Sequence, residues 1–261
     1  MAIVLPTAPA HTESGTLTAC RFEAAGTAKV RAVRDGRSFI LEDGREIRLA
    51  GIEVPLPPAP GESGPKAEAG LAARAALESI LADRMVELYQ NGTVGDRYGR
   101  NLALVAGDGA RRSVAHEMLA RGFARVSARV GDRACAEELL AQERAARAAK
   151  LGLWSGPYYV VLPADNAAEL AGERGHFTVV EGKVWSVRES GGTIYINFGR
   201  RWTQALTVTI SKRDERAFAA AGVEPKKLEA RRVRVRGWIE ERNGPRIEAT
   251  RPEQIELAEH N

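Results

Sequence analysis

Apolar and polar residues alternate along the first part of the chain, and this pattern predicts β-strands. The alternation from Thr27 leads to the turn Asp35-Gly36, after which residues 39–41 are apolar. Asp43-Gly44 is a two-residue hairpin signal, and the alternating residues 47–49 follow it. We therefore expect a three-stranded meander that begins near residue 27.

Helical spacing follows from residue 66. Residues 66–83 are rich in Ala, Leu and Glu, with apolar residues recurring on one face. Strands are expected at 85–89 and 102–105, on either side of a turn-rich segment. Ser113 is the expected N-cap of a second helix, and a third helix is expected from about residue 134 to 150. Strands followed by packed helices are typical of a small barrel of the α+β class.

The last third of the chain predicts a second set of strands. Three strands, a helix and two further strands are expected there, which is the order of an OB-fold. The predicted fold class is therefore α+β or mostly β, with an OB-barrel carrying three helices followed by a second small OB-fold-like β-barrel. The expected parts are a leader (1–26), a first domain (27–156), a linker (157–175) and a second domain (176–257).

Composition and charge narrow the possible classes. The 261 residues contain no segment near the roughly 18 consecutive apolar residues of a membrane-spanning helix, so we expect no membrane span. The net charge is +4, and residues 1–174 hold 22 basic and 22 acidic residues. Residues 175–261 hold 16 basic and 12 acidic residues. The basic excess, which favours anionic partners, therefore belongs to the second domain.

The two cysteines, Cys20 and Cys135, are too few for a zinc site and are either free thiols or one disulfide. Residues 1–10 are apolar and end in an A-x-A pattern, like the end of a signal peptide. Export would put the protein in the periplasm or outside the cell and would favour the disulfide. The alternative is a cytoplasmic protein with a disordered leader.

Three short motifs in the first domain suit phosphate and divalent metal. They are the turn Asp35-Gly36-Arg37, the strand end at residues 47–55 and the turn at residues 96–100. Arginines at a strand end and just past a glycine turn can converge on one phosphate, because a guanidinium binds it bidentately and stays charged. Each motif alone is a weak signal.

Together and in this order, the motifs resemble those of the staphylococcal nuclease-like (thermonuclease) family. The resemblance covers about residues 27–154 and includes the Gly122 step and the closing G-L-W. It implies an OB-barrel with three helices and, in active members, calcium-dependent cleavage of DNA and RNA. It also implies roles for single residues: a phosphate clamp of Arg48 and Arg100, a phosphate contact from Tyr98, and metal ligands at Asp35 and Glu53.

Two positions depart from the family pattern. Arg37 stands where the family has a metal-binding aspartate, and Leu56 stands where it has the general-base glutamate. Loss of a general base typically costs 10²- to 10⁴-fold in rate, and a guanidinium about 5 Å from a divalent ion is unfavourable by on the order of 6 kcal/mol. We therefore expect no cofactor, with Ca²⁺ bound only if the nuclease site still functions. Arg37 either lines an anion pocket with the two clamp arginines or pairs with Glu53 or Asp35.

The second domain carries its own arginine-rich strand. Alternation places Arg232, Arg234, Arg236 and Trp238 on one face, which suits single-stranded nucleic acid. The alternative is the polar outer face of a barrel strand, neutralised by acids on its neighbours. This part also resembles the OB-type modules attached to some bacterial nuclease-like proteins.

The sequence therefore predicts a nuclease-like protein that binds DNA, RNA or another polyanion and lacks efficient calcium-dependent hydrolysis. One alternative is an active or weakly active thermonuclease-type endonuclease. Another is a protein-interaction module. The pattern makes no prediction of the oligomeric state.

Overall fold

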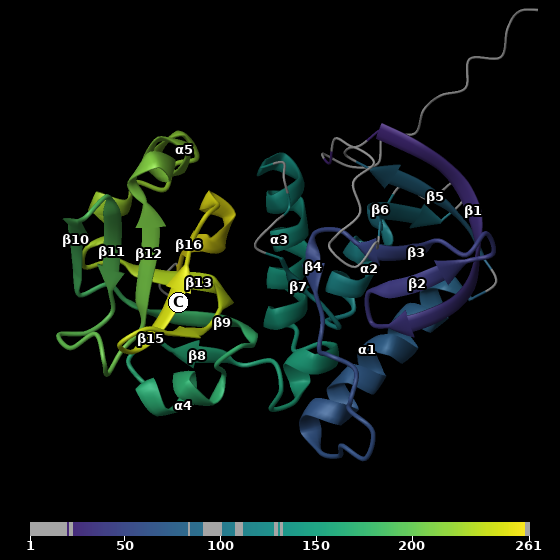
Figure 1. Cartoon of the computed structure of the whole chain (residues 1–261), viewed down its shortest axis with the longest axis horizontal. Helices are drawn as coiled ribbons and strands as arrows, with labels where there is room; N and C mark the ends of the chain where they lie inside the picture. Colours follow the sequence, from purple (N-terminus) through teal and green to yellow (C-terminus); the bar gives the residue numbers. More distant parts are fainter. Residues whose placement is uncertain are drawn as a thin grey trace, which may run out of the picture.

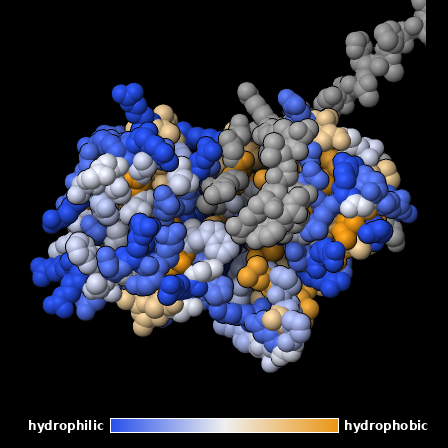
Figure 2. All heavy atoms as spheres, in the orientation of Figure 1, coloured by the Kyte–Doolittle hydropathy of each residue, from blue (hydrophilic) through white to orange (hydrophobic). Residues whose placement is uncertain are grey.

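The computed structural model describes residues 20, 23–82, 84–90, 101–107, 112–127, 130 and 133–258. These residues form two lobes, with helix α3 (Arg133–Ala148) between them (Figure 1). Polar and charged residues cover most of the visible face of both lobes, and hydrophobic residues are exposed there in small patches (Figure 2). Among the described residues, no helix is both long and apolar enough to cross a membrane.

The first lobe is built on a closed five-stranded barrel with the strand order β1-β2-β3-β6-β5. Two very short strands, β4 and β7, pair with each other outside the barrel. The barrel and the three helices expected in this part of the chain are confirmed. Their bounds are β1 Glu23–Asp35, β2 Ser38–Leu41, β3 Glu46–Leu49, β4 Ile52–Glu53, α1 Pro65–Leu81, β5 Met85–Gln90, β6 Asn101–Gly107, α2 Val114–Ala120, β7 Arg125–Val126 and α3 Arg133–Ala148.

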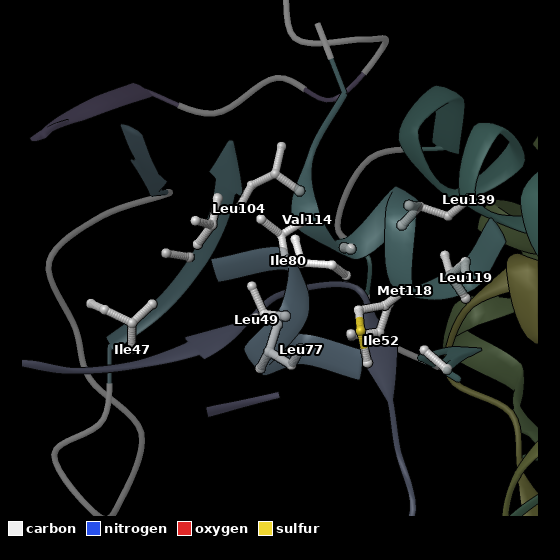
Figure 3. Close-up of a cluster of buried hydrophobic side chains, with 14 of the residues drawn as sticks. Ile47, Leu49, Ile52, Leu77, Ile80, Leu104, Val114, Met118, Leu119 and Leu139 are labelled. Carbon is white, nitrogen blue, oxygen red and sulfur yellow. The ribbon is translucent and has the colours of Figure 1, made fainter. Parts of the chain in front are cut away.

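The core of this lobe lies between the barrel and its helices (Figure 3). Ile47 and Leu49 of β3 are fully buried in it, together with Leu77 of α1 and Met118 of α2. Because side chains alternate along a strand, burying both neighbours of Arg48 turns Arg48 to the opposite face. The hydrophobic pattern of one short strand therefore fixes the direction of a candidate site residue.

Two local features of the sequence fix the start of α2 and the packing of a turn against α1. The side chain of Ser113 accepts a hydrogen bond from the His116 backbone N–H (3.3 Å), so it caps α2 as expected. Gly36 packs directly against Ala73 of α1, where a Cβ atom would collide. This close approach holds the turn after β1 against the helix.

The second lobe consists of two open sheets. The first has the order β10-β11-β12-β15-β14, and the second has the order β16-β13-β9-β8. Closure into an OB-type barrel stays a prediction. The elements of this lobe are β8 Val161–Pro163, α4 Ala167–Gly172, β9 Phe177–Lys183, β10 Ser186–Ser190, β11 Thr193–Asn197, β12 Thr207–Ser211, α5 Glu215–Ala220, β13 Arg232–Trp238, β14 Glu240–Glu241, β15 Pro245–Glu248 and β16 Ile255–Leu257.

The segment expected to be a linker contains more regular structure than its composition suggested. Strand β8 pairs in parallel with β9, and Asn166 caps the short helix α4 by accepting the Glu169 backbone N–H (3.3 Å). The first of the three strands expected before the helix in the last third of the chain is two strands, β9 and β10. Only tertiary pairing reveals β8, because three residues are too short for a periodic pattern.

One disulfide joins Cys20 to Cys135, which are separated by 115 positions in the sequence. It ties the chain just before β1 to the start of α3. In the chain-entropy model, closing a loop of this size stabilises the fold by about 4–5 kcal/mol. The bridge thus fastens a helix that also contacts the second lobe.

Candidate functional site

The turn after β1 is shaped by an aspartate and holds an arginine. The Arg37 backbone N–H donates to Asp35 Oδ1 (2.8 Å), and the Arg37 carbonyl accepts the Leu49 N–H of β3 (2.8 Å). An aspartate that accepts a backbone N–H two residues later is a common turn device. One carboxylate oxygen of Asp35 is therefore engaged in a hydrogen bond within the turn.

The Arg37 side chain points inward and forms an ion pair. Its guanidinium donates to the Ile52 carbonyl (3.2 Å) and to the carboxylate of Glu53, both in β4. The two charged side chains are only 7% and 16% exposed, so water screens the pair weakly. Of the two alternatives for Arg37, the structure has the salt bridge with Glu53.

Arg48 occupies the middle of β3 with its side chain half-buried. It lies opposite Ser38 of β2, the residue that follows Arg37, and it is in register with Leu102 of β6. The two arginines are therefore on neighbouring parts of the barrel wall. Tyr98 and Arg100, the other expected phosphate contacts, lie outside the described residues.

Leu56 is 58% exposed and lies in the loop between β4 and α1. Its backbone carbonyl rests against Gly70 of α1, where a Cβ atom would collide with it. The loop is thus packed on the helix, and its exposed side chain is a hydrocarbon that can neither accept nor donate a proton.

The described acids of this site do not fit a calcium ion. Calcium takes six to eight oxygen ligands, several of them from carboxylates. Here Asp35 accepts the backbone of Arg37, and Glu53 accepts its guanidinium. Within the part of the chain that the structure describes, no group of three or more His, Cys, Asp or Glu side chains could hold a metal.

The arginine-rich strand of the second lobe does not present the basic face that its alternation suggested. Arg232 (2.7 Å) and Arg234 both pair with Glu181 of β9. Trp238 is 44% exposed and packs edge-on against Phe177 (6.0 Å between ring centroids). The single carboxylate of Glu181 thus binds both arginines and offsets part of their charge, in line with the alternative in which acids on neighbouring strands balance this face.

The expectation that Arg236 is exposed is wrong, because its face of β13 packs against the first lobe. Arg236 is fully buried and donates to both carboxylate oxygens of Glu143 in α3 (2.6 and 3.1 Å) and to Glu256 of β16. Burial alone would lower the pKa of Arg236, but Glu143 and Glu256 raise it, and the guanidinium stays charged. It holds the two lobes together and cannot reach a ligand in solution.

Two residues at the boundary of the lobes, Glu143 and Arg125, were not predicted from the sequence. Glu143 lies on the apolar face of α3 beside Leu139 and Ala146, and a charge on such a face signals a buried partner. Arg125 of β7 donates to the Phe177 carbonyl (2.9 Å) and lies over the Tyr159 ring (4.0 Å to the centroid). No local pattern distinguishes Arg125 from a surface arginine.

Comparison with known proteins identifies the family of the first lobe. Residues 46–156 match the family model described as "Staphylococcal nuclease homologue". The chain is also 31% identical over 198 residues to a protein of Verticillium alfalfae named "Probable endonuclease LCL3". That alignment covers 74% of this chain but only 62% of the fungal protein. The first lobe is therefore a domain of the staphylococcal nuclease family, as the motifs predicted.

Proposed function

We propose that the first lobe binds nucleic acid or another polyanion without calcium and hydrolyses it poorly. The observation that carries this proposal is the buried ion pair of Arg37 with Glu53. Of the residues proposed to contact phosphate, Arg48 lies in the described part of the chain. The family implies Arg100 and Tyr98 as further contacts. The site is then a nuclease-type phosphate site in which the Arg37 guanidinium takes the place of the metal.

The ion pair argues against calcium on energetic grounds. A divalent ion bound at Glu53 would displace the Arg37 guanidinium from its carboxylate. Leaving one member of a buried pair without its partner typically costs about 3–5 kcal/mol. Two carboxylates, one of them already accepting a backbone N–H, are a poor source of that free energy. We therefore expect calcium to bind weakly and no cofactor to be required.

Leu56 argues separately against efficient hydrolysis. Attack by water on a phosphodiester needs a group that removes a proton, and a leucine side chain has none. Phosphate binding needs only the arginines, so it survives this change. Loss of the base and loss of the metal are two independent obstacles to cleavage.

An active or weakly active endonuclease remains the second candidate. The observation that favours it is the name of the fungal relative, which describes an endonuclease. A protein-interaction module is the third. Failure to bind oligonucleotides at any salt concentration would favour that role, because binding through phosphate contacts strengthens as the salt concentration falls.

We further propose that the second lobe is an OB-type module and that the protein works in the periplasm or outside the cell. The position of α5 between two sets of strands supports the first assignment; four strands precede it because β9 and β10 take the place of the first expected strand. The disulfide supports the second, because such bridges persist in oxidising compartments.

Arg48→Ala tests the proposed site. In the presence of a chelator, we expect this variant to bind a labelled single-stranded oligonucleotide about 10- to 100-fold more weakly than the unaltered protein, because it loses a charge-assisted hydrogen bond to phosphate. Fluorescence anisotropy gives both dissociation constants. The plot of log affinity against log salt is expected to become shallower by about 0.7.

Arg45→Ala is the matched control. Arg45 lies in the same hairpin, is exposed and pairs with Asp43 (2.8 Å). It is expected to leave the affinity nearly unchanged. Equal dissociation constants for Arg48→Ala and Arg45→Ala would contradict the proposed role of Arg48.

A further inference from the structure

The second lobe has a groove on the outer face of its five-stranded sheet, which we call the tryptophan groove. It is about 650 Å³ in volume, and its lining includes Trp185, Trp202, Tyr195, Arg188, Arg200 and Arg242. We propose that this groove binds single-stranded nucleic acid. It lies in the other lobe from Arg48, so it can bind whether or not the proposed function of the first lobe holds, and a strand long enough to contact both lobes loses affinity when either site is changed.

The floor of the groove follows from strand alternation. Val187 of β10 and Ile194 and Ile196 of β11 face the core of the lobe. The adjacent residues of these strands, Arg188 and Tyr195, therefore face outward. Arg188 of β10 lies directly opposite Tyr195 of β11. Cross-strand pairing thus places a cation beside an aromatic ring on the solvent side of the sheet.

Two loops form the walls of the groove. Trp185 immediately precedes β10, and its backbone N–H donates to the Asn197 carbonyl (2.8 Å). At the other wall, the backbone of Trp202 packs against Gly244, where a Cβ atom would collide with the Trp202 carbonyl. Both tryptophans therefore stand on backbone that is held in position.

The exposure of the tryptophans is what points to a ligand. Trp185 is 54% exposed and Trp202 is 68% exposed. Tryptophan is highly buried on average, so two exposed tryptophans in one groove indicate a surface that is covered when it works. The Arg200 guanidinium lies 5.1 Å from the centroid of the Trp185 ring, which adds a cation beside the stacking surface.

The charge of the groove selects the ligand. Its lining contains four arginines and, among these described residues, no aspartate or glutamate. Arg246 pairs with Glu240 (2.7 Å), whereas Arg188, Arg200 and Arg242 form no ion pair within residues 133–258. Arginines that follow a phosphate backbone, with aromatic rings that stack on bases, are the combination that binds single strands. Bases in a duplex are already stacked, so a duplex could use only the cations.

The groove also replaces the arginine strand as the basic surface of this lobe. Arg232 and Arg234 both pair with Glu181, and Arg236 is buried. On the other sheet, three of the four arginines that line the groove, Arg188, Arg200 and Arg242, form no ion pair within residues 133–258.

The test uses the full-length protein and a fluorescein-labelled oligothymidylate, with oligouridylate and a DNA duplex of equal length as further arms. We expect Trp185→Ala combined with Trp202→Ala to weaken binding of the single strands about 10- to 100-fold, because stacking on each ring is lost. Trp185→Phe combined with Trp202→Phe is expected to restore most of the affinity. Duplex binding is expected to be weaker and to respond little to either change.

Arg213→Ala is the charge control, because Arg213 is exposed in the same lobe and lies outside the groove. An alanine double variant that binds as well as the unaltered protein would overturn the proposal, and so would equal losses for single strands and duplex.

Combining the tryptophan changes with Arg48→Ala separates the two sites. Loss caused only by the tryptophan changes would contradict the proposed function while supporting the groove, and loss caused only by Arg48→Ala would do the reverse.

Discussion

Arg236→Ala is expected to lower the free energy of unfolding by about 3–5 kcal/mol. The change would leave Glu143, whose side chain is fully buried, without the guanidinium that binds both of its oxygens. Arg147 (3.0 Å) and the Val126 backbone N–H (2.6 Å) would still donate to Glu143, but they compensate only part of the charge. Urea denaturation followed by tryptophan fluorescence measures the change.

The same variant should loosen the two lobes. Arg236 also donates to Glu256 and to the Val126 carbonyl (3.4 Å), so it links β13 and β16 of the second lobe to α3 and β7 of the first. We expect the unfolding transition to broaden or divide into two. Arg213→Ala, a change at an exposed site, should stay within about 0.5 kcal/mol of the unaltered protein. A loss below about 1 kcal/mol for Arg236→Ala would show that the network is not the connection described here.

The second large effect is a gain of activity. Arg37→Asp combined with Leu56→Glu is expected to raise calcium-dependent cleavage of single-stranded DNA by about 10²- to 10⁴-fold over the unaltered protein. The first change releases Glu53 from its ion pair and adds a carboxylate beside it. The second puts a proton acceptor at an exposed position on a loop that is packed against α1.

Two measurements decide whether this gain arises as argued. Arg37→Asp combined with Leu56→Gln keeps the polarity and shape of the second change without a base, so it should bind calcium but cleave slowly. Calorimetry should detect calcium binding in both double variants. If neither binds calcium, other parts of the site have diverged as well, and the account of Arg37 as the single replaced ligand is wrong.

The sequence predicted the parts of the site that depend on local pattern. Ile47 and Leu49 are apolar on either side of Arg48, so the strand period alone turns Arg48 away from the core. The turn at Asp35 also follows from local chemistry. The partner of Arg37 could not be chosen in advance, because Glu53 is 16 positions away and reaches Arg37 only through the pairing of the strands between them.

The second lobe shows the limit of the same reasoning. Alternation along β13 placed Arg232, Arg234 and Arg236 on one face, but a period of two does not reveal whether that face meets solvent or α3. The tryptophan groove depends on two loops that are distant in sequence, around Trp202 and Gly244, and on their contact. Only the folded chain brings the exposed Trp185 and Trp202 together with the arginines of the groove.

We propose above all that the first lobe binds polyanions through Arg48 with an internal cation in place of calcium. The most direct test measures how tightly Arg48→Ala and the unaltered protein bind one labelled single-stranded oligonucleotide. The ratio of the two dissociation constants is determined once with chelator and once with millimolar calcium. Gel electrophoresis of the same samples monitors the length of the strands. We expect the same ratio in both conditions, about 10 to 100, and intact strands. A ratio near one with chelator that rises only when calcium is added, or strands cut by the unaltered protein in calcium, would contradict it.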